Sequence, residues 1–165
     1  MNSTLKHIAK KYIKYYKVKS RFSATIRAEQ ESLVTKHQRD LEDKSLPELK
    51  ETGFKLFSQF EEDGLLLYIF SLIGMTNRTF IEFGGDDGIN SNSANLYYNH
   101  DFNGLFIDGN EQALARGRYF FKRHANKRIK QPIFKQAFIT AENINHLFKE
   151  LGFEGEIGLL SIDID

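Results

Sequence analysis

From residue 79 onward, short apolar strands alternate with helical segments, and this alternation constrains the fold more than any other feature of the sequence. Residues 79–83 are β-branched and aromatic and are followed by two glycines, which is typical of a strand ending in a tight turn. The later elements are predicted as helix 93–99, strand 104–108, helix 111–124, strand 133–139, helix 141–151 and strand 157–164. Apolar strands alternating with helices favour a parallel sheet covered on both faces. We therefore expect an α/β, Rossmann-like fold with four strands present.

The residues before this alternation are predicted to be helical. Apolar residues at helical spacing between Leu5 and Tyr16, with lysines between them, indicate a basic amphipathic helix. Residues 23–50 carry charges of both signs and suit an exposed helix or a linker. Capping patterns that begin at Ser45 and Ser58 predict helix starts near Leu46 and after Ser58, and the second helix should end at Gly74. We place a domain boundary at residue 50, between a basic and charged helical N-terminal extension, 1–50, and an α/β domain, 51–165.

Composition excludes several classes of protein. A chain of 165 residues that is 41% hydrophobic and 27% charged suits one globular domain with an appendage. The chain has no cysteine, which excludes thiolate metal sites and favours a reducing compartment. The five histidines show no i, i+4 metal spacing, and no apolar run is long enough to cross a bilayer. We expect a cytoplasmic protein without a zinc site.

The most informative motif is the glycine-rich turn that follows the first predicted strand, residues 82–88. In open parallel sheets, ligands bind beyond the carboxyl ends of the strands, and glycines let the backbone approach them. The dinucleotide pattern G-x-G-x-x-G fails here, because a pattern starting at Gly84 has Asp86 at its second glycine. Asp108 ends the second strand, where a carboxylate can accept hydrogen bonds from both hydroxyls of an adenosine ribose. The alternative is an ordinary strand–helix turn, with Asp108 capping the helix that opens at Glu111.

The charges at these strand ends discriminate between cofactors. Glu82, Asp86, Asp87 and Asp108 would repel a pyrophosphate, and the turn contains no lysine or arginine. S-adenosylmethionine has a ribose, an amino group and a sulfonium but no phosphate, so carboxylates suit its positive end. The residues that we expect to bind it are Glu82, Gly84, Gly85, Asp87, Gly88, Asp108, Gly109 and Asn110, with Gln59 and Asp63 from the segment before the first strand.

Several short segments between Phe57 and Asp165 share a pattern with a known family. They are Ser58–Gln59 with Glu62–Asp63–Gly64, residues 80–84 with Asp87–Gly88, and residues 104–109, 140–145 and 160–165. In these segments the sequence resembles the FkbM-type methyltransferases and their relatives within the class I S-adenosylmethionine-dependent fold. The resemblance implies a seven-stranded sheet and methyl transfer, commonly to a hydroxyl oxygen of a sugar or natural product. Because the fourth predicted strand reaches the last residue, we expect a truncated domain. The resemblance favours a methyltransferase, and the alternative for the chain as given is an incomplete, inactive fragment.

Two acids in the last predicted strand are candidates for catalysis. Asp163 and Asp165 are two residues apart, so both side chains point to the same face at the ligand edge of the sheet. They could share a divalent cation such as Mg²⁺, or help to deprotonate an acceptor hydroxyl. The simpler interpretation, which we favour, is that one caps the next helix and the other orders the cofactor.

Two basic segments have alternative interpretations. The run from Arg116 to Lys130 contains Tyr119, Phe120 and Phe121 and could contact nucleic acid or an anionic acceptor. A solvated helix whose aromatic residues pack on the sheet is favoured. The basic N-terminal segment could bind a membrane surface or dock onto its own domain or a partner. The function expected from these patterns is methylation of a small hydroxyl-bearing acceptor, such as a sugar or glycoconjugate. The alternative is a catalytically inactive Rossmann-like binding or scaffold module.

Overall fold

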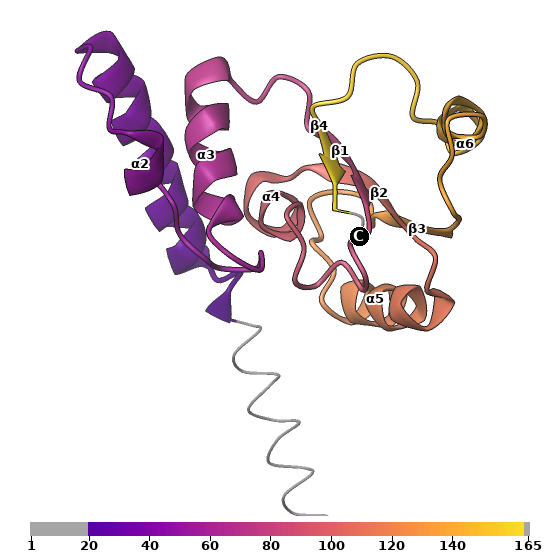
Figure 1. Cartoon of the computed structure of the whole chain (residues 1–165). Coiled ribbons are helices and arrows are strands. Elements are labelled where there is room, and N and C mark those ends of the chain that lie inside the picture. The colour runs from indigo at the N-terminus through magenta and orange to yellow at the C-terminus, as the bar shows by residue number, and fades with distance from the viewer. Residues whose placement is uncertain (1–19, 164–165) are drawn as a thin grey trace, which may run out of the picture.

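A parallel β-sheet organises the computed structural model, which describes residues 20–163 (Figure 1). The strands are β1 (Thr79–Phe83), β2 (Asn103–Asp108), β3 (Ile133–Gln136) and β4 (Leu159–Ile162). They are all parallel and lie in the order β3-β2-β1-β4. The predicted α/β class and the four strands are therefore confirmed, although β3 and β4 are shorter than expected. The amphipathic helix predicted over residues 5–16 and Asp165 both lie outside the described residues.

Alternate residues of each strand face two separate apolar cores. Phe80 and Phe106 belong to the larger core, which they share with residues of α4 (Ala94–His100) and α5 (Glu111–Arg123). Ile81 and Leu105 belong to the smaller core, which they share with Leu147 of α6 (Ile144–Glu150). Since successive side chains of a strand point to opposite faces, this division places helices on both sides of the sheet.

Two further helices precede the sheet. The helix α2 (Ala24–Glu42) packs against α3 (Glu62–Ile73) and α4. Gln30 of α2 is buried and exchanges side-chain hydrogen bonds of 3.0 and 3.1 Å with Asn95, and its Oε1 lies 2.5 Å from His100 Nε2. Residues 23–50 were predicted to be an exposed helix or a linker. A helix forms there, but its contact with the domain is made by buried polar side chains, which apolar periodicity does not reveal.

Both predicted helix starts before the sheet need correction. Only a single 3₁₀ turn, η1 (Leu49–Glu51), follows Pro47, and Glu48 caps it instead of Ser45. The helix α3 begins at Glu62, so Ser58 does not cap it in the expected way. Gly74 ends α3 with φ 87°, as predicted for a glycine C-cap. No helix within residues 20–163 is long and apolar enough to cross a membrane.

Candidate functional site

The carboxyl ends of β1, β2 and β4 meet where the strand order reverses. From β1 the chain adds β2 and β3 on one side and then places β4 on the other side. The Gly84 NH donates to Ile107 O at 3.0 Å, and the Asp163 NH donates to Phe83 O at 3.0 Å. In doubly wound sheets such a reversal opens a crevice that binds ligands. The strand order thus reverses at the predicted location, and ligand binding there stays a prediction.

Glycines allow the turn after β1 to lie against the sheet. Gly84 and Gly88 have φ values of 73° and 69°, which favour glycine. A Cβ at Gly88 would lie 3.1 Å from the Phe106 ring, and one at Gly85 would lie 3.3 Å from it. Side chains at these positions would press against the Phe106 ring, which would have to give by a few tenths of an ångström.

Glu82 supports this turn from inside the protein. Its side chain is 1% exposed, and its two carboxylate oxygens accept hydrogen bonds of 3.0 and 2.9 Å from the backbone NH groups of Asn92 and Ser93. Burial raises the pKa of Glu82, and the negative charge of Asp163 acts in the same direction to a smaller degree. Glu82 thus organises the segment that leads into α4. Its predicted contact with a cofactor remains a prediction.

Asp108 bridges the two turns at the ends of β1 and β2. Its Oδ2 accepts from the Asp86 NH at 3.1 Å, and its Oδ1 accepts from the Asn110 NH at 2.7 Å. Asn110 is the N-cap of α5, since its side chain accepts from the NH groups of Gln112 and Ala113. The alternative reading of Asp108 as the cap of that helix is therefore wrong. An ionised carboxylate has about four lone-pair positions, so the half-buried Asp108 can accept further hydrogen bonds from a ligand.

Arg116 is a neighbour of this turn that sequence reasoning missed. It extends from α5 and lies 3.4 Å from Asp86 Oδ2 and 3.7 Å from Asp87 Oδ2. Gly117 permits this approach, because a Cβ there would lie 2.4 Å from the Asp87 carbonyl oxygen. The turn itself lacks a cation, but the fold supplies one, and this weakens the charge argument against a phosphate-bearing ligand. Arg116 and Asp86 are exposed and Asp87 is half-buried, so each pair is individually weak.

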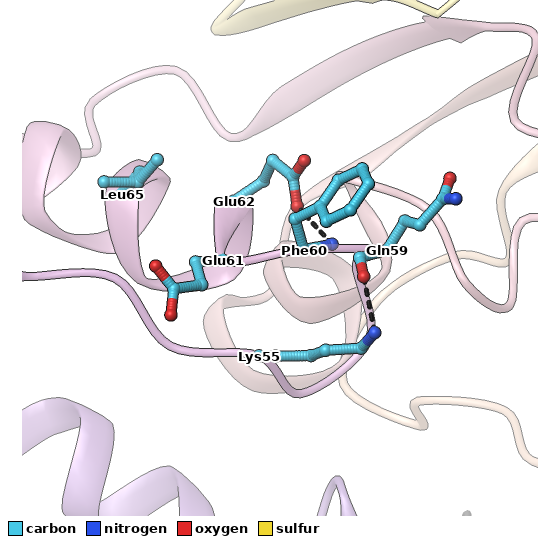
Figure 2. Close-up of a pocket in the computed structure, with 6 residues that line it drawn as sticks. All are labelled: Lys55, Gln59, Phe60, Glu61, Glu62 and Leu65. Atoms are coloured by element: carbon cyan, nitrogen blue, oxygen red, sulfur yellow. Dashed lines mark hydrogen bonds between the residues drawn. The ribbon is translucent and has the colours of Figure 1, made fainter. Parts of the chain in front are cut away.

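Gln59 and Asp63, which were predicted to bind the cofactor together, have different surroundings. Asp63 is 1% exposed, and its Oδ2 accepts from the backbone NH groups of residues 56–58 at 2.6 to 2.9 Å and from Ser58 Oγ at 2.9 Å. Burial raises its pKa. Gln59 is exposed and lines a shallow depression of about 510 Å³, with its side chain pointing away from Leu65 (Figure 2). Asp63 is thus an anchor for the preceding segment, whereas Gln59 is accessible.

A second depression connects this segment to the sheet. Its volume is about 290 Å³, and it shares Glu62 and Leu65 with the first depression. On its other side lie residues of β4 and Asn92, whose side chain donates to Ser161 Oγ at 3.2 Å. The two adjoining depressions thus lead from residues 55–65 to β4. Asn92, which lines the second one, also donates its backbone NH to Glu82 of β1.

Of the two acids that are candidates for catalysis or metal binding, only Asp163 lies within the described residues. Asp163 is exposed just after β4, whereas its predicted companion Asp165 lies outside the described residues. Within residues 20–163, no three histidine, aspartate or glutamate side chains are grouped so that they could hold a metal ion. A metal site at Asp163 and Asp165 therefore stays a prediction.

Comparisons of this chain with protein families, with curated proteins and with solved structures found no match.

Proposed function

We propose that this domain binds S-adenosylmethionine in a class I methyltransferase arrangement and methylates a hydroxyl oxygen of a small acceptor, such as a sugar or glycoconjugate. The observation that carries the proposal is the Asp108 carboxylate, which is fixed by two backbone NH groups beside the glycine turn and keeps acceptor capacity. The chemistry of these residues fits an adenosine ribose, whose hydroxyls need an acceptor at this position.

An exposed aromatic ring extends the same site. Phe138 is 80% exposed, and a Cβ at Gly109 would lie 2.7 Å from its ring. The ring therefore lies against the turn that follows Asp108. A large exposed apolar side chain next to a ribose-binding carboxylate suits the flat face of an adenine.

The contribution of the chain to the reaction would be mainly alignment. When bound, S-adenosylmethionine would supply an electrophilic methyl group. The adjoining depressions at Glu62 and Asn92 would receive the acceptor, and Asp163 at the β4 end would take the proton of its hydroxyl.

Calorimetry with S-adenosylhomocysteine tests the cofactor assignment. We expect binding by the chain and a loss of about tenfold or more in affinity for Asp108→Ala, because a hydrogen bond to a charged group contributes about 1.5–3 kcal/mol. Phe138→Ala should also weaken binding. Asp43→Ala, which removes an exposed acid after α2, is the control and should bind as the original chain does.

No heat of binding up to about 1 mM ligand, or unchanged affinity in Asp108→Ala, would contradict the cofactor assignment. Binding without methyl transfer to any hydroxyl acceptor would instead support the alternative of an inactive binding module.

A further inference from the structure

The sequence contains two long stretches without an acidic residue. Residues 1–28 and residues 112–141 each contain eight lysines or arginines and no aspartate or glutamate. The chain as a whole has a net charge of only +1, so its remaining segments are strongly acidic. The charge of this protein is therefore segregated along the sequence.

The fold brings the described part of the first stretch, residues 20–28, next to the second stretch. Phe22, near the start of the described chain, lies against His124 just after α5, with 5.9 Å between ring centroids. Arg27 of α2 and Arg128 share one carboxylate, since both lie within 3.0 Å of Asp101 Oδ1. Two segments that are about 100 residues apart in sequence thus form one cationic region, and the acid between them is already paired with both.

The solvent side of α5 continues this region. Ala113, Leu114, Gly117 and Phe121 form the buried face of the helix. The exposed residues of the helix and the following loop are mainly cations: Arg116, Arg118, Lys122, Arg123, Lys127, Arg128 and Lys130, which we call the α5 basic face. Lys122, Lys127 and Lys130 have no carboxylate within ion-pair distance among residues 20–163. Tyr119, in the middle of the face, is 66% exposed.

We propose that the α5 basic face binds the surface of an anionic phospholipid bilayer. Charge complementarity selects an anionic partner, and the N-terminal sequence distinguishes a membrane from other polyanions. Leu5, Ile8, Tyr12, Ile13 and Tyr16 recur at helical spacing among lysines, which is typical of a segment that lies in a membrane interface. Binding to a nucleic acid would use the lysines of this sequence but would give no role to its apolar residues.

Stable attachment to a membrane surface usually needs two signals. An amphipathic segment with a polybasic patch is one such combination, and each cation near an anionic leaflet adds to the attraction. The exposed Tyr119 also suits the headgroup region, where tyrosine is enriched. This inference does not depend on the proposed methyl transfer.

Vesicle sedimentation with the full chain tests the proposal. We expect binding to phosphatidylcholine vesicles that contain about 30% phosphatidylglycerol, little binding to phosphatidylcholine alone, and a strong decrease near 0.5 M salt. The triple variant Lys122→Glu/Lys127→Glu/Lys130→Glu should bind the anionic vesicles with an affinity at least about tenfold lower than that of the original chain. Its substitutions are on exposed side chains, and an unchanged circular dichroism spectrum will verify folding.

The matched control changes the net charge by the same amount elsewhere. Lys36, Lys50 and Lys149 are exposed on α2, η1 and α6, and their replacement by glutamate should leave vesicle binding nearly unchanged. An equal loss in both triple variants would overturn the proposal, as would equal binding to neutral and anionic vesicles. Binding to a single-stranded RNA without binding to anionic vesicles would also overturn it and would identify the face as a nucleic-acid site.

Discussion

At the scale of single residues, the acidic side chains that the sequence places near the ligand edge have separate roles. Glu82 and Asp63 are buried and bind backbone NH groups of their own chain. Asp108 binds backbone NH groups too, but it remains accessible, and Asp163 is exposed. Sequence spacing could not separate these roles, because it does not reveal which carboxylates the following loops enclose.

Asp63→Ala should strongly destabilise the domain. The substitution removes the acceptor of three consecutive buried or half-buried NH groups. Each NH group that stays buried without an acceptor costs about 1–3 kcal/mol. We expect a decrease of about 3 kcal/mol in the free energy of unfolding, measured with urea. Glu62→Ala, at the half-buried neighbouring position, serves as the comparison, because the Glu62 carboxylate accepts from one backbone NH group, that of Phe60, at 2.9 Å. A decrease below about 0.5 kcal/mol for Asp63→Ala would show that the observed contacts do not hold this segment.

At the scale of elements, patterns along the chain predicted the strands better than the contacts between helices. Thr79–Phe83 and Asn103–Asp108 agree with prediction to within one residue, because each is a short apolar run with a clear stop. The approach of α5 to the glycine turn was not predictable, since it depends on Gly117 having no side chain where Asp87 passes. A glycine inside a predicted helix was the one signal that could have indicated it.

Gly117→Ala tests whether that close approach matters. Alanine is the better helix former by about 1 kcal/mol, so helix propensity alone predicts stabilisation. The added Cβ would lie 2.4 Å from a backbone oxygen, and relieving such an overlap costs about 1–3 kcal/mol. We expect a net loss of stability and weaker binding of S-adenosylhomocysteine, because the turn must shift. Ala115→Gly, on the exposed side of α5, should lower stability through propensity without affecting the ligand. Stabilisation by Gly117→Ala would contradict the geometry.

At the scale of the whole molecule, α2 and the α/β sheet form one connected structure in the described residues. The domain boundary that apolar patterns predict at residue 50 stays a prediction. Across it, Gln30 contacts Asn95 and His100, and Arg27 contacts Asp101. These contacts pair polar groups that are about 70 residues apart in sequence, and neither periodicity nor composition encodes such pairs. The parallel sheet, in contrast, follows from local patterns that agree with one another.

Asp101 links these parts and gives the molecule a defined response to acid. Burial acts to raise its pKa, but hydrogen bonds from Arg27, Asn126 and Arg128 outweigh burial and lower it to about 2. The pKa of an unfolded aspartate is about 3.9, so the folded state gains stability from the ionised Asp101 above about pH 4 and loses it as the pH falls toward 2. The side chain is 24% exposed, and we expect the contribution to be about 1–2 kcal/mol.

Asp101→Asn isolates this contribution, because asparagine has nearly the same shape as aspartate but no charge. Asparagine also tolerates the φ of 59° at position 101. At pH 7 the variant should be less stable to urea than the original chain by about 1–2 kcal/mol. The difference should shrink below pH 4 and become small near pH 2, where the carboxyl of the folded protein is about half protonated. Asp43→Asn, at an exposed position after α2, should show no such convergence. A stability difference that stays constant from pH 7 to pH 2 would mean that the charge of Asp101 does not hold α2 and the loop at residues 126–128 together.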